Sequence, residues 1–435
     1  MKWHRCLLHI LSWIVLPLHA QSHLTLRECI DYAVCHDVEL KDLEAQRLDA
    51  AADVRMERNK FLPSVNARLT NGLSSGFQQV LTKEMAGKYE SVSSYNNSAQ
   101  LSVSVPVWSA DAQLLSLKLQ RKNGQVVDAR KAERELSLKM EVVRRFYAVL
   151  LAQNRVEEAM HQLEQQDTVL YVSNRMFELG LRAQKDVLDA ELNREQDRYT
   201  LLQEQNAYEM SMIELRNVMS YDGELEITGN VADNLDSVPL SLADACSTLY
   251  ASHPSMVAAR MQLEAAQMQR KIIKRQYYPS LSFGYEVGTN GVSFFSQPNT
   301  SFAEQWRNNA YQAAVLTLQV PIFNRGDVRT QLRKADIAME RSLLSLEDAK
   351  KSIRDDMQVM LADISQSERS FLQAQETELV ADRQYAKALK DYRLGNIPSY
   401  ELNVYKTKNT TARLQTIQAE ITLRYKKELL KIIFE

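Results

Sequence analysis

The sequence predicts an α+β membrane protein built as a tandem structural repeat, in which each repeat joins one β-hairpin to long helices. Three observations lead to this prediction. Short motifs occur twice in the same order. Glycine and proline are scarce, with 12 and 9 among 435 residues, and sparse turn residues indicate long uninterrupted elements. The spacing of apolar residues alternates between a helical period and a period of two, which indicates strands between helices.

The repeat is visible in four short motifs, each of which returns 215 or 216 residues later. Four motifs in one order, with a drift of one residue, indicate a duplication. Each copy is therefore expected to form half of one architecture. The matched segments are 24–26 with 240–242, 63–65 with 279–281, 101–108 with 316–323, and 177–180 with 392–395.

The first twenty residues have the pattern of a secretory leader. Lys2 and Arg5 precede an apolar run at 7–16, and Ala20 offers a small residue for cleavage. An apolar run of about ten residues is too short to cross a bilayer as a helix. We therefore expect 1–20 to be a signal peptide and the protein to be exported.

The first repeat is expected to span 21–222. Its opening segment holds no glycine or proline before Pro63, which is typical of one uninterrupted helix. The hairpin that follows alternates apolar and polar residues at both ends of a long polar loop. An apolar seam with three-four spacing, such as Val143, Tyr147 and Leu150, indicates coiled-coil packing in the long helix. The expected elements are helices at 24–61, 110–179 and 185–221, and a β-hairpin at 63–108.

The second repeat follows the same plan over 240–435, after a linker at 223–239. Pro254 is suited to an early break in its first helix, and Gly395 and Pro398 mark the turn between its last two helices. The expected elements are helices at 242–277, 327–392 and 400–432, and a β-hairpin at 279–323.

The two hairpins have the pattern of outer-membrane strands. Apolar residues alternate with Ser, Asn, Gln and Thr over about 9 to 11 residues, the length of a tilted strand in a bilayer. Aromatic residues gather at two levels, with Trp108 and Phe323 near the helices and Phe77 and Trp306 near the opposite loops. Such levels are expected of interfacial girdles. The alternative is a β-sandwich or barrel packed within a soluble protein.

Four strands from one chain cannot enclose a lumen, and open sheet edges are not tolerated in lipid. Several chains must therefore pool their strands. Three chains would supply twelve strands, although the spacing alone also permits two or four chains.

The ordered motifs, the hairpins and the glycine turns together resemble the TolC-like outer-membrane efflux proteins. The resemblance covers the chain from Leu24 to about Lys431. It implies a homotrimer with a twelve-stranded barrel in the outer membrane and a coiled-coil helical tunnel in the periplasm, closed at its tip. It also implies docking on a periplasmic adaptor (membrane fusion) protein and an inner-membrane pump, contact with outer-membrane lipid, and no enzymatic activity.

The resemblance directs attention to the periplasmic turns at Gly180 and Gly395. In the family, a gate tyrosine and a gate aspartate match Tyr392 and Asp186. The family's gate arginine meets Ile397 in this sequence, so the full network of the family is not reproduced. Two arginines near the turns are candidates to replace the missing one: Arg182 and Arg393.

An acidic constriction is the second feature that the resemblance implies. Of its two aspartate positions, one holds Glu401 and the other Val404. Three Glu401 carboxylates converging on an axis would repel one another and attract cations. The alternative is that Asp186 and Glu401 only stabilise the starts of helices, where acids are favourable. Asp189 is a further candidate, with a solvated helix face as its alternative, and Tyr392 is otherwise an ordinary exposed tyrosine.

The remaining composition argues against other functions. A formal net charge of −2 gives no support for nucleic-acid binding. Outside the expected leader the sequence has three cysteines, and its histidines are scattered without a metal-binding motif. No phosphate-binding glycine loop occurs. We therefore expect neither an enzyme nor a cofactor or metal site, and the alternative function is a periplasmic adaptor or coiled-coil scaffold.

Overall fold

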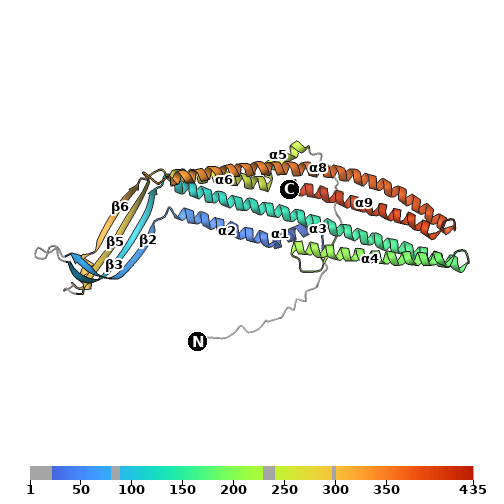
Figure 1. Ribbon diagram of the computed structural model, residues 1–435, viewed down its shortest axis with the longest axis horizontal. Helices are drawn as coiled ribbons and strands as arrows, with labels where there is room; N and C mark the ends of the chain where they lie inside the picture. Colours follow the sequence, from blue (N-terminus) through green and yellow to red (C-terminus); the bar gives the residue numbers. More distant parts are fainter. Residues whose placement is uncertain (1–21, 80–88, 229–240, 296–299, 435) are drawn as a thin grey trace, which may run out of the picture. The chain divides into compact units, whose positions relative to one another are not determined.

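The computed structural model describes residues 22–79, 89–228, 241–295 and 300–434 (Figure 1). The expected signal peptide and residues 229–239 of the expected linker lie outside these ranges. The chain divides into two compact units, and each unit contains segments from both expected repeats. The first consists of Met1–Lys41, Glu133–Leu249 and Arg354–Glu435, and the second of Asp42–Ala132 and Tyr250–Ile353.

Four helices in the first half of the described chain have counterparts of equal length in the second half. The lengths are 11, 22, 67 and 36 residues in both halves. This correspondence supports the duplication that the motifs predict. The pairs are α1 (Leu26–His36) with α5 (Leu242–Ser252), α2 (Val38–Asn59) with α6 (Pro254–Arg275), α3 (Ala112–Glu178) with α8 (Asp327–Arg393), and α4 (Gln184–Met219) with α9 (Ser399–Phe434).

The helix expected at 24–61 is in fact two helices, which is a correction. The chain leaves helical geometry at Asp37, with φ −58° and ψ 127°. The Asp37 carboxylate accepts a hydrogen bond from the backbone N of Leu40 at 2.7 Å, so it caps the start of α2. The second repeat breaks at the equivalent His253, before Pro254, as its sequence predicts. The first break was missed because aspartate, unlike proline, does not exclude a continuing helix.

The linker expected at 223–239 also contains regular structure. Strand β4 (Leu225–Ile227) pairs in parallel with β1 (Ser22–Leu24). This small sheet therefore ties the start of the described chain to the end of the first repeat.

None of the helices in the described ranges is long and apolar enough to cross a bilayer.

The two hairpins form one antiparallel sheet in the order β2–β3–β5–β6 (Figure 1). Three strands are longer than the expected 9 to 11 residues, because part of the serine- and asparagine-rich segment expected as loop continues the ladder. The hydroxyls of Ser74 and Ser94, for example, bond across β2 and β3 at 2.8 Å. The strands are β2 (Ser64–Gln79), β3 (Tyr89–Trp108), β5 (Ser280–Phe294) and β6 (Tyr311–Gln319).

The register of the sheet separates apolar from polar side chains. Leu101 lies opposite Val287, and Phe283 lies opposite Leu316, so these side chains share one face. This apolar face is open to solvent within the single chain, with Leu316 64% exposed. Neighbouring positions such as Glu286 face the other side. The sheet therefore has one exposed apolar face and one polar face, and β2 and β6 are its edges.

A short helix, α7 (Phe302–Asn308), lies in the connection between β5 and β6 and was not expected. The ladder between β5 and β6 ends at the Gly288–Tyr311 pair. Beyond it, Gln305 Oε1 accepts a hydrogen bond from Val292 N at 2.7 Å, and Asn309 Nδ2 donates to Asn290 O at 2.8 Å. Side chains thus satisfy the backbone edge of β5 where no strand does.

Candidate functional site at the helix tips

The two turns that join α3 to α4 and α8 to α9 have the same geometry. Gly180 and Gly395 adopt positive φ angles of 71° and 81°. Leu181 N donates to Met176 O at 2.8 Å, and Asn396 N donates to Asp391 O at 2.9 Å. These six-to-one bonds, with a glycine in the left-handed conformation, form Schellman motifs that end a helix sharply. Both turns are therefore encoded locally by the glycines that the sequence singles out.

Tyr392 lies in the last turn of α8 and is fully buried, not an exposed tip residue. Its hydroxyl lies 2.6 Å from Ser173 Oγ of α3. The Ser173 hydroxyl donates its hydrogen to Val169 O at 2.9 Å, so Tyr392 must be the donor to Ser173. A buried phenol with a satisfied hydroxyl thus joins the second helical hairpin, α8 and α9, to the first helical hairpin, α3 and α4.

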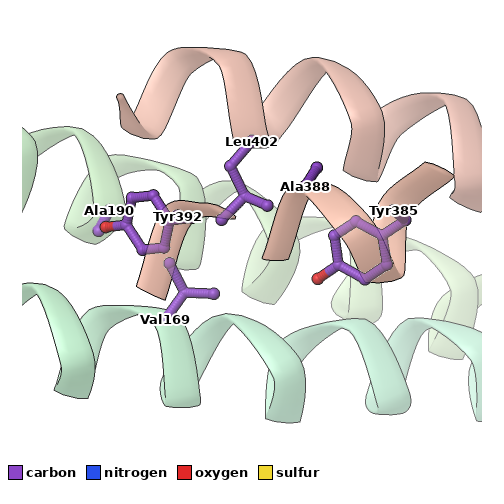
Figure 2. Close-up of a cluster of buried hydrophobic side chains, with 6 residues drawn as sticks. All are labelled: Val169, Ala190, Tyr385, Ala388, Tyr392 and Leu402. Carbon is purple, nitrogen blue, oxygen red and sulfur yellow. The ribbon is translucent and has the colours of Figure 1, made fainter. Parts of the chain in front are cut away.

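An apolar cluster surrounds Tyr392. Figure 2 shows the tyrosine ring near Val169 of α3, Ala190 of α4 and Leu402 of α9. Tyr385 and Ala388 extend the cluster along α8. The side chains of all four helices of the tip therefore meet in one core.

Arg182, in the turn between α3 and α4, connects the two tip turns. Its Nη2 atom donates to the carbonyl oxygens of Tyr392 at 2.9 Å and Ile397 at 3.0 Å. Its Cζ atom lies 4.0 Å from the centre of the Tyr392 ring, in cation–π geometry. The side chain is only 6% exposed. We call these interactions of Arg182 with Tyr392 and Ile397 the Arg182 contact.

The expected gate pair, Tyr392 and Asp186, is connected only through Arg182. An Arg182 Nη1 atom lies 3.6 Å from an Asp186 oxygen, while the Tyr392 hydroxyl bonds to Ser173 instead. Two arginines were considered as replacements for the one absent at position 397. Arg182 makes the contacts described above, whereas Arg393 is exposed. Ile397 contributes its backbone carbonyl and packs its side chain against the apolar cluster.

The other acidic candidates remain predictions. Asp186 and Glu401 lie in the first turns of α4 and α9, where acids stabilise a helix start. The side chains of Glu401 and Asp189 are partly buried and form no hydrogen bond or ion pair with other described residues. Val404, at the second constriction position, is 49% exposed. A ring of Glu401 carboxylates requires further copies of the chain.

Sequence reasoning missed several polar residues that the fold buries. Ser173 carries no local signal, because its partner lies 219 residues away. Lys406 and Asn409 of α9 could have been found, since they lie in helical register with Leu402 and Ala412, and all four are buried. A lysine in such a register calls for a buried partner.

The described residues hold no cluster of three or more His, Cys, Asp or Glu side chains able to bind a metal ion. The chemistry available at the tips consists of hydrogen bonds, ion pairs and packing between helices.

The chain is similar to known proteins both in sequence and in fold. The profile of a family described as outer membrane efflux protein matches residues 29–220 and 245–429. Outer membrane protein TolC of Vibrio cholerae is 24% identical over 354 residues, which cover 79% of this chain and 75% of that protein. The alkaline protease secretion protein AprF of Pseudomonas aeruginosa is 22% identical over 265 residues, which cover 59% of this chain and 52% of AprF. The structure of the outer-membrane channel OprN matches with a TM-score of 0.79 and 17% identity, over 94% of this chain and 89% of OprN.

Proposed function

Because the chain belongs to the family of outer membrane efflux proteins, we propose that it is the exit duct of a tripartite efflux or type I secretion system. It is a protein of the outer membrane with a periplasmic helical domain, and its family is one of transport channels, not enzymes. The family description points to efflux, and the name of the relative AprF, a protease secretion protein, points to secretion. The transported substrate is therefore proposed only as a small molecule or a protein.

Three copies of the chain form the duct in this proposal. The four strands of one chain present an exposed apolar face, which suits lipid, and a polar face, which suits a water-filled lumen. The edges of β2 and β6 need partners in a membrane, because unpaired backbone groups are costly there. Pairing β6 of one copy with β2 of the next would close a barrel of twelve strands.

Transport through the duct is passive, and its partners are a periplasmic adaptor and an inner-membrane pump that supplies the energy. The helical hairpins form the periplasmic tunnel, with the tips at Gly180 and Gly395 facing the pump. Gating then consists of a loosening of these tips when adaptor and pump engage.

The Arg182 contact is the observation that carries the proposal of a gate. It joins the turn of the first hairpin to the turn of the second through two hydrogen bonds and a cation–π interaction. A tip that opens by parting the hairpins must break these interactions. The buried Tyr392–Ser173 bond has the same consequence.

The first test is the native mass of the protein extracted in mild detergent from separated membrane fractions. A trimer in the outer membrane that conducts ions in planar lipid bilayers is the expected result. A soluble periplasmic monomer would instead favour the adaptor or scaffold function.

A further inference from the structure

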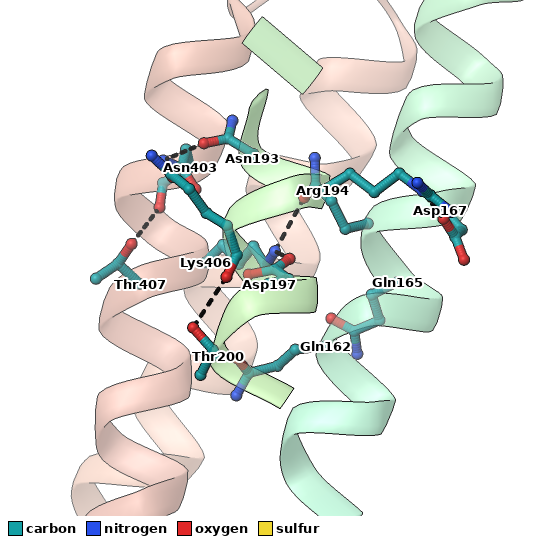
Figure 3. A network of polar contacts seen from close by, with 12 residues as sticks. Gln162, Gln165, Asp167, Asn193, Arg194, Asp197, Thr200, Asn403, Lys406 and Thr407 are labelled. Carbon is teal, nitrogen blue, oxygen red and sulfur yellow. Dashed lines mark hydrogen bonds and ion pairs between the residues drawn. The ribbon is translucent and has the colours of Figure 1, made fainter. Parts of the chain in front are cut away.

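A second polar contact between the two helical hairpins lies farther along the helices from Gly180 and Gly395 than the Arg182 contact does. Lys406 of α9 forms an ion pair with Asp197 of α4 (Figure 3). Its Nζ atom also donates to Gln166 Oε1 of α3 at 2.9 Å. The Gln166 amide in turn donates to Ala190 O of α4 at 3.1 Å. Lys406, Asp197 and Gln166 are called the Lys406 network below.

The charges of this network are held away from water. The Lys406 side chain is 9% exposed and the Asp197 side chain 18%. Burial raises the pKa of Asp197, and the Lys406 ammonium opposes that change. Removing two charges from water costs free energy, and well-packed apolar residues often serve stability equally well. Stability alone is therefore a weak reason for an ion pair at this place.

The Lys406 network differs from a neighbouring ion pair in which helices it connects. Lys406 belongs to the second hairpin, while Asp197 and Gln166 belong to the first, so the contact crosses between hairpins. The nearby pair of Arg194 and Asp167 joins α4 to α3 within the first hairpin and is more exposed, at 34% and 51%. Parting the two hairpins would break the first contact and leave the second intact.

We propose that Lys406 is a positioning residue of the gate, whose ion pair with Asp197 and hydrogen bond to Gln166 hold α9 against the first hairpin in the closed state. The proposal rests on the proposed gating of an export duct at the helix tips. When the hairpins part, water reaches both charges, so the open state has no need of the pair. The closed state is therefore disfavoured when one charge of the pair is present without the other.

The cost of leaving one buried charge unpaired determines whether each substitution favours the open or the closed state. Lys406→Met leaves Asp197 buried without its cation, which disfavours the closed state more than the open state. Asp197→Leu does the same to the ammonium. The double variant Lys406→Met with Asp197→Leu removes both charges and fills the space with apolar groups, so it restores the closed state.

Single-channel recording of the purified full-length protein in planar bilayers tests the proposal. Each single variant is expected to raise the fraction of time that the channel is open by about tenfold. The free energy lost when a buried ion pair is broken exceeds the amount that corresponds to a tenfold change in an equilibrium. The double variant is expected to return close to the unmodified protein. Arg194→Met is the matched control, because its exposed pair lies within one hairpin, and its gating should not change.

Two results would overturn the proposal. One is an unchanged open fraction in both single variants while Arg182→Ala increases it, which leaves tip gating intact and removes Lys406 from it. The other is a double variant as open as the single variants. If Arg182→Ala is also without effect, the gating proposal itself fails. Thermal dissociation of each oligomer is measured in parallel, because a purely structural role would lower that temperature without changing the open fraction.

Discussion

The Tyr392 cluster at the helix tips is buried, whereas the apolar face of the four-stranded sheet is exposed. At the tips Tyr392 is completely buried within one chain, and its hydroxyl finds Ser173 in the same chain. On the sheet Leu69 is 75% exposed and Leu316 64% exposed, and β2 and β6 have open edges. The cluster around Tyr392 is thus completed within one chain, whereas the apolar face of the sheet is left open and is covered by lipid only in the proposed assembly.

This difference separates two kinds of mutational effect. A substitution on the apolar face of the sheet should decide whether the protein assembles in the membrane at all. A substitution at the tips should leave assembly intact and change the state of the assembled protein.

The largest effect is expected for Leu101→Arg in the centre of β3. Leu101 lies on the apolar face, opposite Val287, and an arginine facing lipid costs roughly 2–4 kcal/mol at the middle of a bilayer. The amount of heat-modifiable oligomer in the outer-membrane fraction should fall steeply. Ser102→Arg, one residue along on the polar face, is the matched control and should assemble. Equal loss in both variants would contradict the assignment of the two faces.

Arg182→Ala tests the tips. It removes two hydrogen bonds to carbonyls and a cation–π interaction, at about 1.5–3 kcal/mol for a charged hydrogen bond. The oligomer should form normally, but the fraction of time that its channel is open should rise by about tenfold or more. Arg175→Ala is the control, because Arg175 pairs with Glu178 on an exposed surface of α3. An open fraction that rises equally in both variants would exclude a specific role for Arg182.

Asp37→Ala tests the helix break, which lies in neither of the two contrasted regions. Although burial opposes it, the hydrogen bonds from Arg134 and Leu40 N and the charge of Arg134 hold the pKa of Asp37 below its ordinary value. Loss of the cap should cost about 1–2 kcal/mol at neutral pH. The contribution of a carboxyl with a lowered pKa is present above its unfolded value near 3.9 and is lost as pH falls through the folded value.

The measurement for this variant is the melting temperature of the helices as a function of pH, with Asp42→Ala in the exposed part of α2 as control. The difference between Asp37→Ala and the unmodified chain should be full at pH 6–7 and should shrink below about pH 4. A difference that stays constant down to pH 2 would mean that the ionised carboxylate is not what stabilises this break.

The smallest effect is expected for Gly395→Ala. The added methyl group meets no atom within 4 Å, but alanine is strained at a φ of 81° by about 1 kcal/mol. Gly124→Ala, in the interior of α3, should have the opposite sign, because alanine favours a helix by about 1 kcal/mol and the nearest atom lies at an ordinary 3.8 Å. Thermal melting of both variants checks the pair of signs. The same sign in both would show that the tip turn is not set by its left-handed glycine.

The features that could be foreseen are local ones. The long helices, the alternating ends of the strands and the two glycine turns follow from spacing and turn chemistry within a few residues. The break at Asp37 was missed because an aspartate cap competes with helix continuation only through its own hydrogen bond. Helix α7 was missed because its role is to satisfy the edge of β5, and Asn290 and Val292 give no hint of which residues will do so.

The sequence by itself determined the duplication, the order of the long helices and the two β-hairpins, and the membership in an efflux family, because these depend on periodicity and on short motifs. Only the tertiary structure decided which polar groups meet: Tyr392 with Ser173, Arg182 with the opposite turn, and Lys406 with Asp197, all more than 200 residues apart. Such pairs depend on the rotation of each helix about its axis, which the packing of the whole tip fixes.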